Sequence, residues 1–88
     1  MKLGNKETVE RFYAANAFMA SNRFNEAISL LNEISNDQNS VLEVEAKWYL
    51  ALCYIHQDNK AQAEELLRDL YNMFPDYKPQ SVKSLLSK

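Results

Sequence analysis

The sequence has 88 residues, a length that folds as one domain around a single, modest hydrophobic core. Hydrophobic residues make up 47% of the chain and charged residues 25%, which excludes a disordered or collagen-like protein. The net charge of −2 provides no excess of basic residues to neutralise phosphates, and this argues against nucleic acid as a partner.

Two features of the sequence favour a stack of helical hairpins. Glycine and proline are scarce, with one Gly and two Pro, whereas strands joined by tight turns would need many more of both. The sequence also repeats: at an offset of 36 residues Phe12 aligns with Trp48, and the alignment continues without a gap to Ile34 and Leu70. A repeat of this period indicates stacked helical hairpins.

The first copy of the repeat predicts two helices. Apolar residues at spacings of three and four predict a helix over about residues 6–21, and because it is apolar on more than one side we expect it to be covered on two sides. A second helix over about 23–35 has one apolar face. Asn22 and Asn25 are candidates to cap its start.

The second copy opens with a polar turn at residues 36–39. Ser40 is followed three residues later by Glu43, a spacing typical of a capping box, in which each residue bonds the other's backbone amide. This pair predicts the start of a third helix over about residues 41–56.

The last third of the sequence predicts two more helices. Asp58 and Asn59 end the third helix, and a fourth over about 60–73 ends before Phe74, because a residue that precedes proline avoids the helical conformation. A short fifth helix begins at Pro79, where proline is tolerated, and carries Val82, Leu85 and Leu86. We expect this helix to cap the apolar end of the stack; the alternative is the truncated first helix of a third repeat.

The residues that recur in both copies resemble the tetratricopeptide repeat (TPR), whose pattern combines an early Leu, small residues, aromatic residues and a closing Pro. In the second copy the matching residues are Leu50, Ala51, Tyr54, Ala63, Leu67 and Pro75. In the first copy they are Ala14, Ala15, Phe18, Phe24, Ala27 and Leu31. Small alanines allow the two helices of a hairpin to pack closely, and the aromatic residues fill the space beside them.

Three departures from the family pattern indicate a divergent member with a looser stack and a longer turn around residues 36–40. Trp48 lies one residue later than the early Trp of the family. Ile34 and Leu70 are large where the pattern has a small residue. The period is also about two residues longer than the usual 34.

The resemblance implies an all-α fold, a right-handed stack of antiparallel helical hairpins with five helices here. One domain would span residues 1–88, with the first repeat at about 6–39, the second at about 41–75 and the capping helix at about 79–87. First helices of the family line a concave side that holds peptides or other proteins, and few members are enzymes. The resemblance therefore implies a scaffold or adaptor without catalytic activity.

The concave positions of the family, carried over to this sequence, give a candidate binding surface. Its residues are Phe12, Asn16, Met19, Trp48, Leu52 and Ile55, flanked by Val9, Ala20, Glu45 and His56. If exposed together, the apolar members would form a patch of about a few hundred Å², which monomers seldom leave bare. Two interpretations are open: a groove for an apolar peptide or a partner's helix, or a structural face covered by a second copy, the fifth helix or neighbouring repeats.

One specialised binding mode of the family is expected to be absent. Some of its repeats grip a partner's terminal carboxylate with paired Lys and Asn side chains. Asn16 stands at the position of one such Asn, but Phe12 replaces the Lys and Tyr49 replaces a second Asn. We therefore interpret Asn16 as an ordinary polar helix residue.

No group of residues in the sequence points to catalysis, a metal or a cofactor. His56 is the only histidine, and we expect it at a helix end, where it interacts with the helix dipole. Cys53 has no basic residue or second cysteine nearby, so we expect a buried, inert thiol. Glu64, Glu65 and Asp69 are expected on the solvated outer side of the fourth helix.

The sequence shows neither a membrane span nor a signal peptide. No apolar run approaches the roughly 18 residues that a span requires, and residues 1–10 lack the apolar stretch of a signal. We expect a soluble protein, cytoplasmic unless the chain is a fragment of a membrane or exported protein. The expected partner is a protein or peptide, with a homodimer as the alternative.

Overall fold

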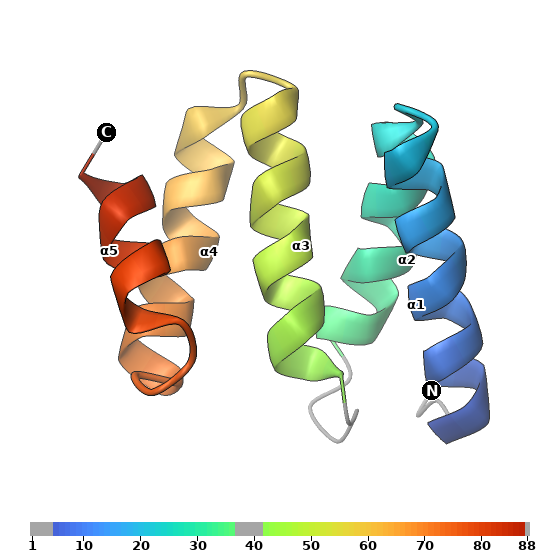
Figure 1. Ribbon diagram of the computed structural model, residues 1–88, viewed down its shortest axis with the longest axis horizontal. Coiled ribbons are helices and arrows are strands. Elements are labelled where there is room, and N and C mark those ends of the chain that lie inside the picture. Colours follow the sequence, from blue (N-terminus) through green and yellow to red (C-terminus); the bar gives the residue numbers. More distant parts are fainter. Residues whose placement is uncertain (1–4, 37–41, 88) are drawn as a thin grey trace.

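The computed structural model describes residues 5–36 and 42–87, and in these residues the chain forms five α-helices and no strand. The helices are α1 (Asn5–Ala20), α2 (Phe24–Ser35), α3 (Glu43–His56), α4 (Lys60–Met73) and α5 (Pro79–Leu86). In Figure 1, α1 and α2 form one hairpin, α3 and α4 form a second beside it, and α5 closes the far end. Each helix packs against the next along the chain. The predicted all-α stack of helical hairpins is confirmed.

Helix α3 contributes buried residues to two hydrophobic clusters, one on each of its sides. The first cluster joins α1, α2 and α3 through Ala15, Ala27, Leu31, Ile34, Ala46, Leu50 and Cys53. The second joins α3, α4 and α5 through Ala51, Leu67, Leu70 and Val82. Because both sides of α3 are apolar, its sequence shows no single dominant apolar face, unlike the sequences of α2 and α4.

Four alanines lie at the contacts between neighbouring helices. Ala15, Ala27 and Ala51 are fully buried, and Ala63 is 1% exposed. Phe18 and Tyr54 are partly buried and pack against the first cluster. The small side chains therefore occupy the crowded positions that the repeat pattern predicted, with aromatic rings at the periphery of the first cluster.

Both hairpins turn in the same way. Asn22 and Asp58 adopt the left-handed conformation, with φ of 61° and 59°. The next backbone amide in each turn reaches back to the helix: Arg23 N–H donates to Phe18 O at 2.7 Å, and Asn59 N–H donates to Tyr54 O at 2.8 Å. This is the Schellman motif, which satisfies carbonyls that a helix C-terminus leaves unbonded.

The left-handed turn makes Asp58 sensitive to a branched substitution. We expect Asp58→Val to lower the free energy of unfolding by about 1–2 kcal/mol, because a Cβ-branched residue is strained at positive φ. Urea unfolding monitored by far-UV circular dichroism measures this. Asp58→Gly, which relieves the strain, is the control and should be at least as stable as Asp58→Ala. Equal stability of the Val and Gly variants would contradict the assigned turn.

The capping prediction for α2 was wrong for Asn22 and Asn25. Asn22 ends α1, and Arg23 occupies the N-cap position of α2 without a side-chain cap. Asn25 instead links the start of α2 to the end of α3, because its Oδ1 accepts a hydrogen bond from Gln57 Nε2 at 2.7 Å. In the second hairpin Asn59 does cap α4, its Oδ1 accepting from the Gln62 amide at 3.5 Å.

The start of α3 also differs from the prediction. Residues 37–41, which include Ser40 and most of the predicted polar turn, lie outside the described residues. The structure begins α3 at Glu43 and places Leu42 in the N-cap position, so the predicted start at residue 41 was two residues early. Glu43 and Glu45 then lie in the first turn, where the positive end of the helix dipole favours carboxylates.

Helix α1 is covered less completely than its sequence predicted. Ala15 and Thr8 are fully buried, whereas Tyr13 is 69% exposed and Val9 is 36% exposed. Ala17 and Ala20 are exposed as well. The apolar residues of α1 therefore divide into a buried side against α2 and α3 and a bare outer edge, so the expectation of cover on two sides was wrong.

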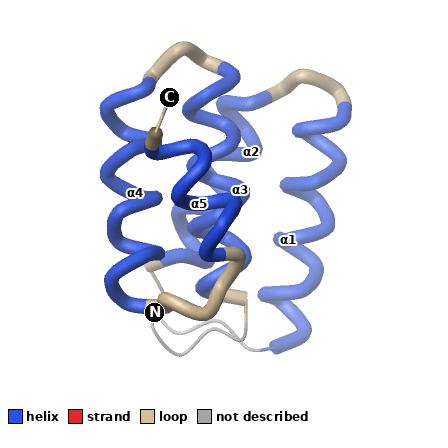
Figure 2. Tube along the Cα trace, turned by 60° about the vertical axis from the view of Figure 1, so that its left-hand side comes forward, coloured by secondary structure: helices blue, strands red, loops and turns tan. Residues whose placement is uncertain are grey.

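Helix α5 lies across the second hairpin, as Figures 1 and 2 show from two directions. It begins at Pro79, as predicted, after Lys78 in the left-handed conformation with φ of 43°. Val82 is fully buried in the second cluster, and Leu85 and Leu86 are partly buried against it. Gln80, Ser81, Lys83 and Ser84 are exposed, so α5 covers an apolar surface and presents a polar one.

Candidate protein-binding surface

An apolar stripe runs along the side of α3 that faces α5. Val44, Trp48, Leu52 and Ile55 follow one another at spacings of four, four and three, so they lie on one side of the helix. Each of them lines a hollow on the surface. We call this row of three hollows the trough. It spans about 16 Å along α3, at about 1.5 Å of rise per helical residue.

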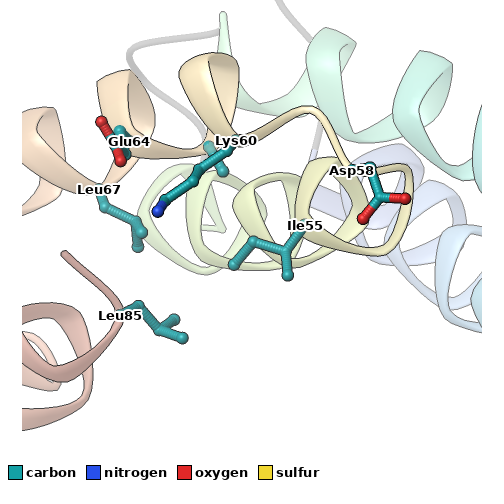
Figure 3. Close-up of a pocket in the computed structure, with 7 residues that line it drawn as sticks. Ile55, Asp58, Lys60, Glu64, Leu67 and Leu85 are labelled. Atoms are coloured by element: carbon teal, nitrogen blue, oxygen red, sulfur yellow. The ribbon is translucent and has the colours of Figure 1, made fainter. Parts of the chain in front are cut away.

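The hollow at one end of the trough, the Ile55 hollow, has a volume of about 370 Å³. Helices α3, α4 and α5 and the turn after α3 all contribute to it, through Ile55, Asp58, Lys60, Ala63, Glu64, Leu67 and Leu85. Figure 3 shows Ile55 and Leu85 on different sides of the opening, with Leu67 and Lys60 reaching toward the space between them. Ile55 is 38% exposed, so an apolar side chain of considerable size faces solvent here.

Two shallower hollows continue the trough along α3. The Trp48 hollow, of about 440 Å³, is lined by Trp48, Leu52, Gln80, Ser81, Ser84 and Leu85, and therefore shares Leu85 with the Ile55 hollow. The Phe74 hollow, of about 570 Å³, is lined by Val44, Glu45, Met73, Phe74, Pro75, Asp76 and Tyr77. Apolar side chains thus form the floor of the trough, and hydroxyls, an amide and carboxylates lie beside them.

Two aromatic residues of the trough, Trp48 and Tyr77, share one lysine. The Lys78 ammonium lies 6.0 Å from the centre of the Trp48 ring and 5.7 Å from that of Tyr77, both within reach of a cation–π interaction. Burial, and then the charge of Glu45, raise the pKa of the Tyr77 phenol. Lys78 therefore links the start of α5 to α3 and fixes one wall of the trough.

Comparison with known families identifies the second hairpin. Residues 45–77 match the family model described as a tetratricopeptide repeat, and this range includes nearly all of α3, all of α4 and, apart from Val44, every trough residue that lies outside α5. The protein is TPR-like. No curated protein and no solved structure matches the chain. Such repeats are typically non-enzymatic modules of protein–protein interaction. The trough is therefore the first surface of this TPR-like protein to consider as a binding site for a partner.

The structure divides the six predicted binding residues between two places. Trp48, Leu52 and Ile55 line the trough. Phe12 and Met19 are partly buried against the first cluster, and the Phe12 ring meets the Tyr49 ring edge-on at 5.4 Å.

Asn16, the polar member of the predicted surface, bonds within its own helix. Its Nδ2 donates to the Phe12 carbonyl at 3.0 Å, one turn earlier in α1. Asn16 is partly buried. A side chain that bonds the preceding turn matches its interpretation as an ordinary polar helix residue.

Sequence reasoning missed the residues that α4 and α5 contribute to the trough. Leu67 and Leu85 were interpreted as core and capping residues, and both also line the Ile55 hollow. The spacing of apolar residues on α3 was a sufficient signal for the α3 stripe. No comparable signal exists for Leu85, because its place depends on how α5 crosses the hairpin.

The three acidic residues of α4 do not share one solvated side. Glu65 and Asp69 are exposed and lie beside Leu50, Tyr54 and Leu66 on the side toward α2. The Glu64 side chain is 29% exposed, lines the Ile55 hollow and pairs with Arg68 at 3.5 Å. One residue of helix rotates a side chain by about 100°, and this separates Glu64 from its neighbour. The prediction was therefore wrong for Glu64.

Cys53 is fully buried, as predicted, and burial raises the pKa of its thiol to about 11. A raised pKa keeps the group a thiol at every pH below about 11, so its nucleophilic thiolate is scarce. We expect native Cys53 to react with Ellman's reagent at pH 8 at least tenfold more slowly than the same protein in 6 M guanidinium. Absorbance at 412 nm measures both rates. Equal rates would contradict the burial of this thiol.

The remaining chemistry-bearing groups are placed as follows. His56 ends α3, as predicted, is exposed, and stacks on the Phe24 ring at 4.7 Å between centres. In the described ranges no group of three or more His, Cys, Asp or Glu residues could hold a metal ion. No helix over those same residues is long and apolar enough to cross a bilayer.

Proposed function

We propose that this TPR-like protein is a scaffold or adaptor that binds a protein or peptide in the trough between α3 and α5. The observation that carries the proposal is the apolar stripe of Trp48, Leu52 and Ile55, which lines hollows instead of being sealed by α5. Fully burying an exposed side chain of this size contributes about 1.5–3 kcal/mol, and a partner would gain the share that belongs to the fraction still exposed, 38% at Ile55. The three anchors would together offset part of the entropic cost of association.

The arrangement around the trough supports the proposal. Protein interfaces combine an apolar centre with a polar rim that remains wet. Here the floor is apolar, while Gln80, Ser81 and Ser84 of α5 supply amide and hydroxyl groups along one edge. The proposal keeps Phe12, Asn16 and Met19 of α1 as a second part of the surface, outside the trough; Phe12 meets Tyr49, which follows Trp48 in the sequence and packs on the first cluster.

Selection from a random peptide library displayed on phage tests this function. We expect enriched peptides that bind the wild-type protein and lose at least tenfold in affinity toward Ile55→Asn, because the variant places an amide in the apolar hollow. Ile55 is already 38% exposed, so the variant should keep its fold, which circular dichroism checks. Tyr13→Asn, on the outer edge of α1, is the matched control and should bind normally. Peptides indifferent to Ile55→Asn would contradict the function.

The alternative, a homodimer built on the same surface, makes a different prediction for the mass in solution. A protein whose trough is open for a partner is a monomer at micromolar concentration, and sedimentation equilibrium measures its mass. A dimer that Trp48→Ala or Ile55→Asn dissociates would assign the trough to a second copy of the chain and overturn the proposed function.

A further inference from the structure

We propose that the occupant of the trough is a basic amphipathic helix of a partner protein, with large apolar side chains along one side and Lys or Arg residues near its ends. This inference rests on the proposed function, because it names the chemistry of the partner that the same surface binds. Three observations support it: the charges at the ends of the trough, the backbone of its walls, and the helix that already lies on the second hairpin.

Carboxylates outnumber basic side chains in the lining at both ends of the trough. Glu45 and Asp76 line the Phe74 hollow at one end, and Asp58 and Glu64 line the Ile55 hollow at the other. Lys60 is the single basic residue among those that line the three hollows. A partner with positive charge near each end of its apolar stripe would therefore meet complementary charge at both.

Nearby basic side chains are held by other groups. Lys78 lies over the Trp48 and Tyr77 rings, and Lys83 lies over the Tyr71 ring at 5.4 Å. Arg68 pairs with Glu64 at 3.5 Å, with its own side chain 67% exposed. Glu45 and Asp76 at one end and Asp58 at the other are the carboxylates best placed to meet a partner's charges.

The walls of the trough favour a helix over an extended peptide. An extended peptide exposes backbone N–H and C=O groups that need hydrogen-bonding partners when they are buried. Along the middle of the trough the walls are helices, whose own backbone groups are bonded internally, and the turn residues Asp58 and 74–77 lie only at its two ends. The floor consists of apolar side chains. A helix satisfies its backbone internally, so it can lie in such a trough and contribute side chains alone.

Helix α5 is an example of this chemistry within the chain. It packs on the second hairpin through Val82, Leu85 and Leu86, at the spacings of three and four that give a helix one apolar side. The charged residue of α5 is Lys83, and Lys78 directly precedes the helix. The surface of α3 and α4 thus already holds one short, basic, amphipathic helix, and the trough beside it offers the same floor to another.

The proposal predicts the shape of the partner's stripe. The trough extends about 16 Å, the length of about 11 helical residues. Three side chains at positions i, i+4 and i+7 or i+8 cover about 10–12 Å of that length on one side of a helix, and Trp48, Leu52 and Ile55 have the first of these spacings on α3. The hollow of about 370 Å³ at Ile55 has room for a large apolar side chain such as Leu, Met or Phe.

A set of designed peptides tests the inference directly. The first is a capped 14-residue helix with Leu at three positions spaced as above, Lys at both ends and no Trp. The second has Glu in place of every Lys, and the third is the first peptide with two internal residues, neither Leu nor Lys, replaced by proline. Because Trp48 is the only tryptophan of the chain and lines the trough, its emission reports binding at the site.

We expect the Lys peptide to change Trp48 emission saturably, and the Glu and proline peptides to bind at least tenfold more weakly. Raising NaCl from 50 to 500 mM should weaken the Lys peptide several-fold, because salt screens the end charges. The double variant Glu45→Gln, Asp58→Asn should also bind it several-fold more weakly. Glu65→Gln with Asp69→Asn, which removes the same charge from the side toward α2, is the matched control and should bind normally.

Several results would overturn the inference. Equal binding of the Lys and Glu peptides would show that the partner need not be basic. Equal binding of the Lys and proline peptides would show that the partner need not be a helix. If the Lys peptide does not bind at 1 mM, both parts of the inference are wrong. If library peptides bind through Ile55 but are acidic or rich in proline, the proposed function holds and this inference fails. If no peptide of any kind depends on Ile55, the proposed function fails with it.

Discussion

Replacing Leu50 by alanine is expected to lower the free energy of unfolding by about 2–5 kcal/mol. Leu50 is 2% exposed and lies on α3 in the first cluster, where it packs with residues of α1 and α2. Truncation removes buried methyl groups and leaves a cavity that three packed helices cannot readily close. A chain of this size is expected to have a total stability of only about 4–13 kcal/mol, so the loss is a large fraction of it.

Leu52→Ala is the matched control for this experiment. Leu52 lies two residues along the same helix and is partly exposed in the Trp48 hollow. The substitution changes the same atoms and the same helix propensity, so the difference between the two variants reports burial alone. Urea unfolding curves at 25 °C give both free energies. If Leu52→Ala costs as much as Leu50→Ala, the burial of Leu50 in the first cluster is wrong.

Enlarging the buried alanines is expected to have the second largest effect on stability. Ala27→Leu and Ala63→Leu should each lower the free energy of unfolding by about 1–3 kcal/mol, because three extra carbon atoms must fit where the side chain is at most 1% exposed. The neighbouring helices would have to move apart or adopt strained rotamers.

The chain offers controls for both alanine variants. Ala61→Leu lies two residues from Ala63 on α4, and Ala17→Leu lies on α1; both positions are exposed. Leucine is nearly as good a helix former as alanine, so these variants should change stability by less than about 0.5 kcal/mol. Thermal unfolding followed by circular dichroism compares all four. Unchanged melting of Ala27→Leu and Ala63→Leu would contradict the close pairing of the helices.

The helices were predictable from the sequence because their periodicity is local. The range predicted for α4 coincides with the observed one, and the first residue of α5 is the predicted Pro79. The burial of Ala15, Ala27, Ala51 and Ala63 followed from the repeat. Where the helix ends were misassigned, an Asn was interpreted as an N-cap although the same residue type also ends helices in the left-handed conformation, as Asn22 does.

The candidate site could be predicted only in part. The α3 residues of the trough share a side of one helix, so their spacing identified them. The contribution of Leu85 depends on how α5 packs on the hairpin, and the acidic ends formed by Glu45 with Asp76 and by Asp58 with Glu64 depend on how α3, α4 and the segments that follow them come together. Residues far apart in the sequence meet there, and no local pattern reports their meeting. The exposed edge of α1 at Tyr13 was missed for the same reason.

Amide chemical-shift mapping tests the binding surface most directly. A library-selected peptide is titrated into isotope-labelled protein, and shift changes are followed residue by residue. We predict the largest changes over residues 44–58 of α3 and its turn and over residues 80–85 of α5, with small changes along α2. Largest changes on α2, on the outer edge of α1 around Tyr13, or beside Glu65 and Asp69 would contradict the trough as the site of binding.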